Sequence, residues 1–193
     1  PYYNLENCCQ RCARPLDRNS EEILCLRCHL TPPAFSRTYP IFEYRYPINI
    51  LIQQAKFSEN LTILTVLAKL MLQRLDYQQR PDVLIPVPLH PKRLRQRGYN
   101  QSLELAKIVA RGCHLPLNNQ ICRRIRYTTP QAQLNARERE TNLTHAFKIQ
   151  SFNPSWQHIA LLDDVMTTGT TADEIATVLL QAGARQVDIW CCA

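Results

Sequence analysis

One stretch decides the fold of this chain: Leu161-Leu162-Asp163-Asp164-Val165-Met166-Thr167-Thr168-Gly169-Thr170-Thr171. It begins as the end of an apolar run, residues 158–162, which is typical of a buried strand. Two adjacent carboxylates and a turn rich in hydroxyls follow, and apolar residues then recur at the spacing of a helix. The sequence therefore predicts a strand, a polar loop and a helix in direct succession.

The loop in this stretch has the chemistry of a phosphate site. A helix N-terminus presents unpaired N–H groups and a partial positive charge, and Gly169 allows the backbone to approach a ligand closely. Asp163 and Asp164 stand where a sugar attached to the phosphate would place its cis hydroxyls, or where Mg2+ would bind. The alternative is an ordinary capped helix, which needs only one acidic and one hydroxyl residue. The candidate site residues are the catalytic pair Asp163 and Asp164, and, for the phosphate, Val165, Met166, Thr167, Thr168, Gly169, Thr170 and Thr171.

Further strands and helices alternate along the rest of the chain. A strand, loop, helix and strand at this spacing form a βαβ unit, so we expect an α/β fold with a parallel sheet and helices on both faces. Residues 39–46 are predicted to be a short strand or an extended entry, and residues 90–100 a polar, basic loop. Gly112 and Gly183 are expected to end helices. The other strands are expected at 83–88 and 186–192, and the helices around 48–55, 61–75, 105–109 and 175–182.

Four cysteines near the N-terminus have the spacing of a zinc site. Cys9-x2-Cys12 and Cys25-x2-Cys28 are two CxxC turns separated by twelve residues. Each turn directs two thiolates at one point, and two such turns complete the tetrahedral shell that zinc prefers. Because four thiolates leave no open coordination position, we expect a structural Zn2+ that braces the N-terminal segment.

Two alternatives stay open at this cluster. A Cys8-x3-Cys12 pair is conceivable, although CxxC geometry favours Cys9, and His29 could replace its neighbour Cys28 as a ligand. A redox CxxC motif would not explain two copies. Crowding of cysteines at one end of the chain favours metal chemistry in a reducing compartment over a disulfide framework.

Composition narrows the class of protein. The chain has 193 residues, 45% of them hydrophobic, and a net charge of +7, which mildly favours an anionic partner. Disordered, collagen-like and coiled-coil classes are excluded, and no apolar run reaches the length that spans a bilayer. The Pro32-Pro33 break divides the chain into an expected zinc-binding module, residues 1–35, and a larger domain, residues 36–193. We expect a cytoplasmic protein, at most associated with the inner face of the membrane.

Two basic stretches suit phosphate groups, with a solvated basic face as the alternative. Tyr99 and Tyr127 lie beside them and offer rings on which bases could stack. The segment 123–142 is long, polar and poor in apolar anchors, so it is a candidate lid over the ligand, a DNA contact or an exposed linker. The first stretch offers Lys92, Arg93, Arg95 and Arg97 as ligands for a polyanion. The candidate lid residues or DNA contacts of the second stretch are Arg123, Arg124, Arg126, Gln131, Arg139 and Asn142.

The threonine loop resembles the phosphoribosyl pyrophosphate (PRPP) signature of type I phosphoribosyltransferases. Within that superfamily the chain is similar to the ComF family (ComFC/GntX-like), which is associated with natural competence and uptake of transforming DNA. The four-cysteine segment and the Arg97-Gly98-Tyr99-Asn100-Gln101 stretch narrow the resemblance to ComF. Other matching motifs are Pro86-Val87-Pro88, and Thr129-Pro130-Gln131 before Asn142 and Ala146-Phe147.

The resemblance implies a ligand and roles for the site. Asp163 and Asp164 would face the ribose hydroxyls of PRPP with Mg2+ as its cofactor, residues 167–171 would bind the 5′-phosphate, and residues 87–97 would contact pyrophosphate. It implies a competence-associated protein that handles transforming single-stranded DNA, beside a competence helicase and recombination-mediator proteins. The alternative is an active transferase that moves phosphoribose from PRPP to an unidentified acceptor. The sequence reveals no nucleobase pocket.

Overall fold

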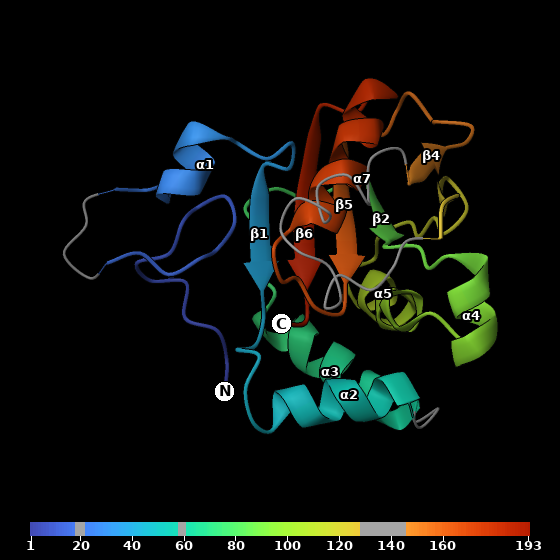
Figure 1. The fold of residues 1–193 in the computed structure, drawn as a ribbon, viewed down its shortest axis with the longest axis horizontal. Coiled ribbons are helices and arrows are strands. Elements are labelled where there is room, and N and C mark those ends of the chain that lie inside the picture. The colour runs from blue at the N-terminus through green and yellow to red at the C-terminus, as the bar shows by residue number, and fades with distance from the viewer. Residues whose placement is uncertain (18–21, 58–60, 128–145) are drawn as a thin grey trace.

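The computed structural model describes residues 1–17, 22–57, 61–127 and 146–193. At its centre lies a four-stranded parallel sheet with the strand order β1-β6-β5-β2 (Figure 1). The strands are β1 Arg37–Pro40, β2 Val83–Pro86, β5 His158–Asp163 and β6 Gln186–Cys191. The expected α/β fold with a parallel sheet is confirmed.

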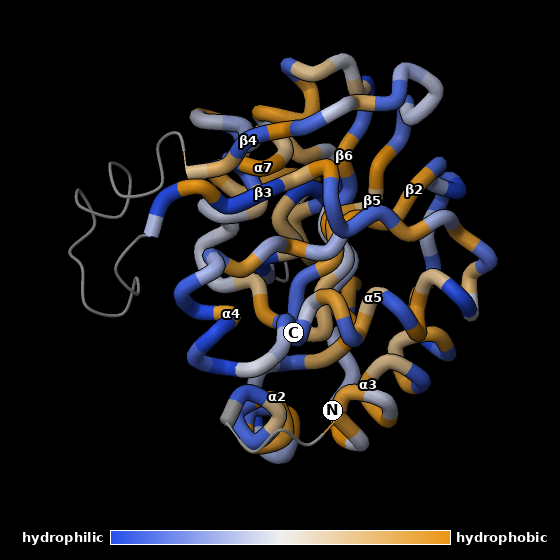
Figure 2. Tube along the Cα trace, turned by 90° about the vertical axis from the view of Figure 1, so that its right-hand side faces the viewer, coloured by the Kyte–Doolittle hydropathy of each residue, from blue (hydrophilic) through white to orange (hydrophobic). Residues whose placement is uncertain are grey.

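Helices cover both faces of this sheet. One face is packed by α2 (Ile48–Phe57), α3 (Leu61–Arg74) and α5 (Gln101–Gly112). The other face is covered by α7 (Thr170–Gln181) and by the antiparallel pair β3 (Cys122–Arg124) and β4 (Phe147–Ile149). The helices alternate between hydrophobic and hydrophilic segments along the chain, as amphipathic helices do (Figure 2).

Strand residues alternate between two hydrophobic cores. Leu162 and Trp190 point to the core under α2, α3 and α5, whereas Leu161 and Ile189 point to the core under α7. Since both faces of the sheet are covered, β2 and residues 159–162 of β5 are continuous apolar runs rather than alternating ones. The apolar runs that the sequence marks as strands are therefore the interior of the fold.

The expected loop at residues 90–100 is wrong, because this segment contains a helix, α4 (Pro91–Arg97). Proline at the first helical position is pre-organised for a helix, and the His90 ring nitrogen Nδ1 accepts a hydrogen bond from the backbone N–H of Lys92 (3.2 Å). Gly98, with φ of 77°, ends the helix. The predicted loop was inferred from charge, but arginine, lysine, glutamine and leucine are also good helix formers.

Two other boundaries differ from expectation. The strand β1 spans Arg37–Pro40, whereas a short strand or an extended entry was expected at residues 39–46. Gly112 is the last residue of α5 but has no positive φ; a Cβ there would lie 2.4 Å from Leu72 Cδ1, so glycine serves the close packing of α5 on α3. Gly183, with φ of 120°, follows α7 as predicted.

In the described parts of the chain, none of the helices is long and apolar enough to cross a membrane. The N-terminal segment carries one short helix, α1 (Leu26–Leu30), which precedes the Pro32-Pro33 break. The division into residues 1–35 and 36–193 stays a prediction.

Candidate functional site: an acidic and threonine-rich sheet edge beside a four-cysteine cluster

The two predicted ligand-binding segments, residues 87–97 and 163–171, both begin at the carboxyl ends of the sheet's strands, which we call the edge of the sheet. β2 and β5 are parallel neighbours with Pro86 opposite Leu162, so the chain continues from both strands on the same side. Asn100 ties the segment after β2 to the start of α5. Its Nδ2 donates to the Val87 carbonyl (3.0 Å), and its Oδ1 accepts from the backbone N–H of Ser102 (3.1 Å). In open α/β sheets, the carboxyl ends of the strands are where ligands bind.

Asp163 ends β5 and is held by two donors. Its Oδ1 accepts hydrogen bonds from Ser102 Oγ (2.9 Å) and from the backbone N–H of Asp164 (2.8 Å). Burial, and then the neighbouring Asp164 carboxylate, raise the pKa of Asp163 to about 7, although these hydrogen bonds and Lys56 act in the opposite direction. Among the described residues no hydrogen bond engages Asp163 Oδ2, which leaves an oxygen for a ligand hydroxyl or a hard cation.

Asp164 is paired with a lysine that sequence reasoning missed. Lys56 Nζ, near the end of α2, lies 3.0 Å from Asp164 Oδ2, and both side chains are largely buried (22% and 14% exposed). Asp164 Oδ1 accepts from the backbone N–H of Val165 (2.8 Å). Ser102 was missed too, because it stands among other polar residues at the start of α5, and the only sequence signal for Lys56 was a single cation near the end of α2.

The threonine turn leads into α7 without a side-chain cap. Gly169, at φ of 77°, occupies the N-cap position, which makes no side-chain hydrogen bond to the helix. The hydroxyls of Thr168 and Thr170 lie 2.8 Å apart, and residues 165–172 line a small hollow together with Asp163 and Ile189. The first N–H groups of α7 therefore face a hollow rimmed by hydroxyls, as an anion site requires.

The two basic stretches, far apart in sequence, lie close together. Burial, and then the positive charges of Arg124, Arg95, Lys92 and Arg93, lower the pKa of His90. Burial, and then Arg93, lower the pKa of Arg124, while Asp163 is among the groups that raise it. One cavity is lined both by His90 and Leu94 and by Arg123 and Arg124, so β3 lies beside the start of α4.

Tyr127 joins this basic surface. Its ring packs edge-on against His90 at 5.2 Å, and Lys92 Nζ lies 4.7 Å from its centroid. Arg97 turns toward α5, where its Nη1 donates to Gln101 Oε1 (3.3 Å). The basic surface comprises Lys92, Arg93 and Arg95 of α4, and Arg123, Arg124 and Arg126 on and just after β3. Gln131, Arg139 and Asn142 lie outside the described residues.

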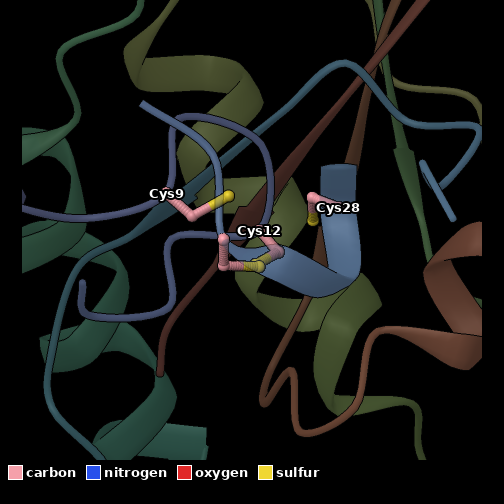
Figure 3. A group of neighbouring side chains, drawn as sticks. Cys9, Cys12 and Cys28 are labelled. Atoms are coloured by element: carbon pink, nitrogen blue, oxygen red, sulfur yellow. The ribbon is translucent and has the colours of Figure 1, made fainter. Parts of the chain in front are cut away.

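The four cysteines of the two CxxC turns meet in space. The sulfurs of Cys9, Cys12, Cys25 and Cys28 all lie within 4.8 Å of one another, and those of Cys9, Cys12 and Cys28 point toward one another in Figure 3. The backbone N–H of Ala13 bonds to the Cys9 carbonyl (2.9 Å) to close the first turn, and Cys25 is the N-cap of α1. Cys8 instead directs its thiol to the Asn4 carbonyl (3.3 Å).

The spacing of these sulfurs fits a metal. Cys12 Sγ and Cys25 Sγ lie 3.7 Å apart. Zinc–sulfur bonds of about 2.3 Å in a tetrahedron separate the sulfurs by about 3.8 Å. The four cysteines can therefore hold a metal ion such as Zn2+, and the expected ligand set with Cys9 rather than Cys8 is the one whose sulfurs converge.

Several known proteins are similar to this chain over most of their length, and two of them are described here. The chain is 35% identical over 189 residues to the DNA utilization protein YhgH of Escherichia coli O157:H7, covering 95% of this chain and 82% of that protein. It is 32% identical over 190 residues to competence protein F of Haemophilus influenzae, covering 94% and 82%. No protein-family model matches.

Among solved structures, the allosteric regulatory enzyme of purine biosynthesis aligns with a TM-score of 0.44 and 21% identity, over 67% of this chain and 25% of that chain. We assign no residue from so loose an alignment.

Proposed function

This chain belongs to the ComF family of competence proteins, and on that premise we propose that it acts in the handling of transforming single-stranded DNA through a site that binds PRPP with Mg2+. The names of the relatives, competence protein F and DNA utilization protein, support the cellular role. The observation that supports this ligand is the arrangement at the carboxyl end of β5. Among the described residues, Asp163 Oδ2 makes no hydrogen bond there, and it lies beside the hydroxyl-rich start of α7.

Each part of the edge matches one part of the ligand. The N–H groups at the start of α7, with Thr167, Thr168, Thr170 and Thr171, take the 5′-phosphate. Asp163 and Asp164 take the ribose hydroxyls and Mg2+, for which carboxylate oxygens are suitable ligands. Mg2+ supplies charge neutralisation between the carboxylates and the phosphates when bound.

Lys92, Arg93, Arg95 and Arg97 are proposed to serve pyrophosphate. The first three lie on the basic surface, where the charge of Asp163 acts to raise the pKa of Arg124. Arginine forks bind phosphate oxygens in two places at once, so the same surface suits a DNA backbone. Tyr127 adds a ring on which a base could stack.

An active phosphoribosyltransferase is the second candidate function. It is favoured by the cations of α4 and β3 beside the acidic edge, because they would stabilise a departing pyrophosphate. Catalysis would then be electrostatic, and the residues above would hold PRPP without a covalent intermediate. The two functions share one ligand site.

The remaining roles complete the proposal. Zn2+ is proposed as a structural ion on the four cysteines that braces residues 1–35 against the larger domain, residues 36–193. The protein would act in the cytoplasm beside a competence helicase and recombination-mediator proteins.

Thermal unfolding tests the PRPP site. A ligand that binds only the folded state stabilises it by about 2.7 kcal/mol at one hundred times its Kd. We therefore expect PRPP with Mg2+ to raise the Tm of the metal-loaded chain by about 5–10 °C. Inorganic phosphate with Mg2+, at the same concentration, is the control for a general anion effect. An equal Tm with PRPP and with phosphate would contradict the proposed site.

A further inference from the structure

We infer that the cavity between α4, the start of α5 and β3 binds an acidic peptide segment of a partner protein, with a bulky apolar side chain inserted into the cavity. The cavity has a volume of about 660 Å³, within the range of about 300–1,000 Å³ that is usual for ligand sites. Among the described residues, it shares none with the small hollow at the start of α7. The inference therefore goes beyond the proposed function and does not depend on PRPP.

The lining of this cavity is mainly apolar. Aliphatic and proline side chains line it from the end of β2, from α4, from the start of α5 and from the end of β3. These residues, with one tyrosine, are Pro86, Pro88, Leu89, Pro91, Leu94, Tyr99, Leu103 and Ile125. Leu94 and Ile125 are 40% and 53% exposed. Apolar side chains that gather on a surface with polar residues around them mark a place where another molecule binds.

Positive charges surround the apolar lining. Arg123 and Arg124 line the cavity, and so does His90, whose pKa is lowered by burial and then by nearby positive charges, first that of Arg124. Glu104 is the single acidic residue among the described lining residues, and Lys107 Nζ lies 2.8 Å from its carboxylate. A segment that carries carboxylates around an apolar side chain is complementary to this arrangement in both charge and polarity.

The lining favours a peptide side chain over a base of single-stranded DNA. Among the described lining residues, only Tyr99 and His90 carry aromatic rings. The Tyr99 hydroxyl donates to the Ala55 carbonyl, and the His90 ring packs edge-on against Tyr127 at 5.2 Å. Bases of single-stranded nucleic acid bind chiefly by stacking on aromatic faces, whereas aliphatic and proline side chains suit a leucine-like side chain. DNA on the exposed basic surface would leave the cavity itself unused.

Hydrogen bonds fix the two sides of the cavity. On the β3 side, the backbone N–H of Ile125 donates to the Ala146 carbonyl (2.8 Å). On the α4 side, the backbone N–H of Gly98 donates to the Leu94 carbonyl (2.8 Å) and ends the helix. A cavity held in this way is preformed, so little ordering of the chain opposes binding.

Fluorescence anisotropy of the metal-loaded chain with a labelled hexapeptide of four aspartates and two leucines tests the inference. We expect saturable binding that weakens as salt is added, because salt screens exposed charges. The same peptide with serines in place of the leucines should bind at least about tenfold more weakly, since it has no apolar side chain to bury. Leu94→Gln with Ile125→Gln, which removes apolar lining and keeps every charge, should weaken binding of the leucine peptide by a similar factor.

Leu61→Gln is the matched control, because it makes the same change on another helix. Leu61, at the start of α3, is 48% exposed and does not line the cavity. Its substitution should change the peptide affinity by less than about twofold, as is usual for a surface position away from a site. Both variants alter exposed side chains, so each should keep the Tm of the unmodified chain within a few degrees.

The outcomes separate this inference from the proposed function. Absence of peptide binding, equal binding of the serine and leucine peptides, or equal binding by the double variant and the unmodified chain overturns the peptide site. A loss of single-stranded DNA affinity in the double variant as large as the loss of peptide affinity would show that the cavity takes a base of DNA, and would also overturn it. The Tm increase with PRPP should be unchanged in the double variant, so the PRPP site stands or falls by its own measurement.

Discussion

The four-cysteine segment and the threonine loop lie side by side, but they are held in place by different forces. The cysteine segment has a core made of Cys9, Cys25 and Cys28 with a few partly buried neighbours, while Leu26 and Leu30 of α1 are 73% and 70% exposed. The threonine loop follows β5, whose central residues 159–162 are fully buried between two layers of helices. We therefore expect the first region to depend on a metal bound by its cysteines, whereas the second rests on the hydrophobic core of the sheet.

Removing the metal should produce the largest effect and should be confined to the first region. Structural zinc contributes about 10–16 kcal/mol in small zinc-binding peptides, far more than the apolar contacts of the cysteine segment can replace. We expect Cys9→Ser with Cys28→Ser to abolish metal binding and to make residues 1–30 sensitive to protease. The sheet should still unfold cooperatively on heating.

Cys8→Ser is the matched control, because Cys8 contacts the Asn4 carbonyl rather than the other thiols. It should retain one metal ion per chain, measured by atomic emission. Loss of the metal from this variant would show that the assignment of Cys9 as ligand is wrong. Loss of the sheet transition from the double variant would show that the two regions do not differ as described.

A DNA-binding measurement separates the basic surface from the cysteine segment, because α1 and α4 lie at opposite sides of the sheet (Figure 1). We expect single-stranded DNA to bind the basic surface, so that Arg123→Gln with Arg126→Gln lowers affinity about tenfold or more and reduces the salt slope by about 0.7 per lost phosphate contact. Arg111→Gln with Arg185→Gln, at the end of α5 and directly before β6, is the control. If the slope changes on metal removal instead, DNA binds the cysteine segment.

Ionisation of the buried Asp163 should lower the free energy of unfolding as the pH rises. The folded chain holds a proton on Asp163 up to about pH 7, whereas an unfolded aspartate loses it near pH 4, so stability falls as the pH rises between these values. Asp163→Asn removes this penalty while its oxygen still accepts from Ser102. We expect its Tm to exceed that of the unmodified chain by roughly 3–6 °C at pH 8, and to match it near pH 3.5. A difference that does not vary with pH would contradict the raised pKa.

The substitution Lys56→Gln should have the smallest effect, and it should change the affinities for Mg2+ and for PRPP in opposite directions. Its charge balances Asp164 at 3.0 Å, so Lys56→Gln makes the edge more negative. We expect Mg2+ alone to bind a few-fold tighter and PRPP a few-fold weaker, as a partly buried ion pair of about 1 kcal/mol would allow. Lys107→Gln, which breaks an exposed pair with Glu104 on α5, should change neither affinity by more than about twofold. Changes of the same sign for both ligands would rule out a charge effect.

The two regions also differ in how far sequence predicts them. The cysteine cluster is local, because two CxxC turns carry the whole ligand set. The choices between Cys8 and Cys9 and between Cys28 and His29 needed three dimensions. The strand, threonine turn and helix at 158–181 follow from an apolar run, a hydroxyl-rich turn and apolar residues at helical spacing. These are features that neighbouring residues in the chain determine.

The partners of the acidic pair could not be predicted in this way. Ser102 and Lys56 reach Asp163 and Asp164 from helices that lie far away in sequence, and their side chains have no motif of their own. The helix α4 was missed because a basic composition was taken to indicate a loop. The cavity beside α4 was missed because its walls come from the end of β2, α4, the start of α5 and β3, which only tertiary packing brings together.

Calorimetric titration of the metal-loaded chain with PRPP and Mg2+ tests the central claim most directly. Asp163→Asn with Asp164→Asn removes both carboxylates and keeps their shape, and the Cys8→Ser variant is the control for a change outside the site. We predict saturable binding near one ligand per chain by the unmodified protein and by Cys8→Ser, and at least a hundredfold loss in the double variant. Equal heats from the double variant and the unmodified chain, or none from a folded, metal-loaded protein, would contradict the account.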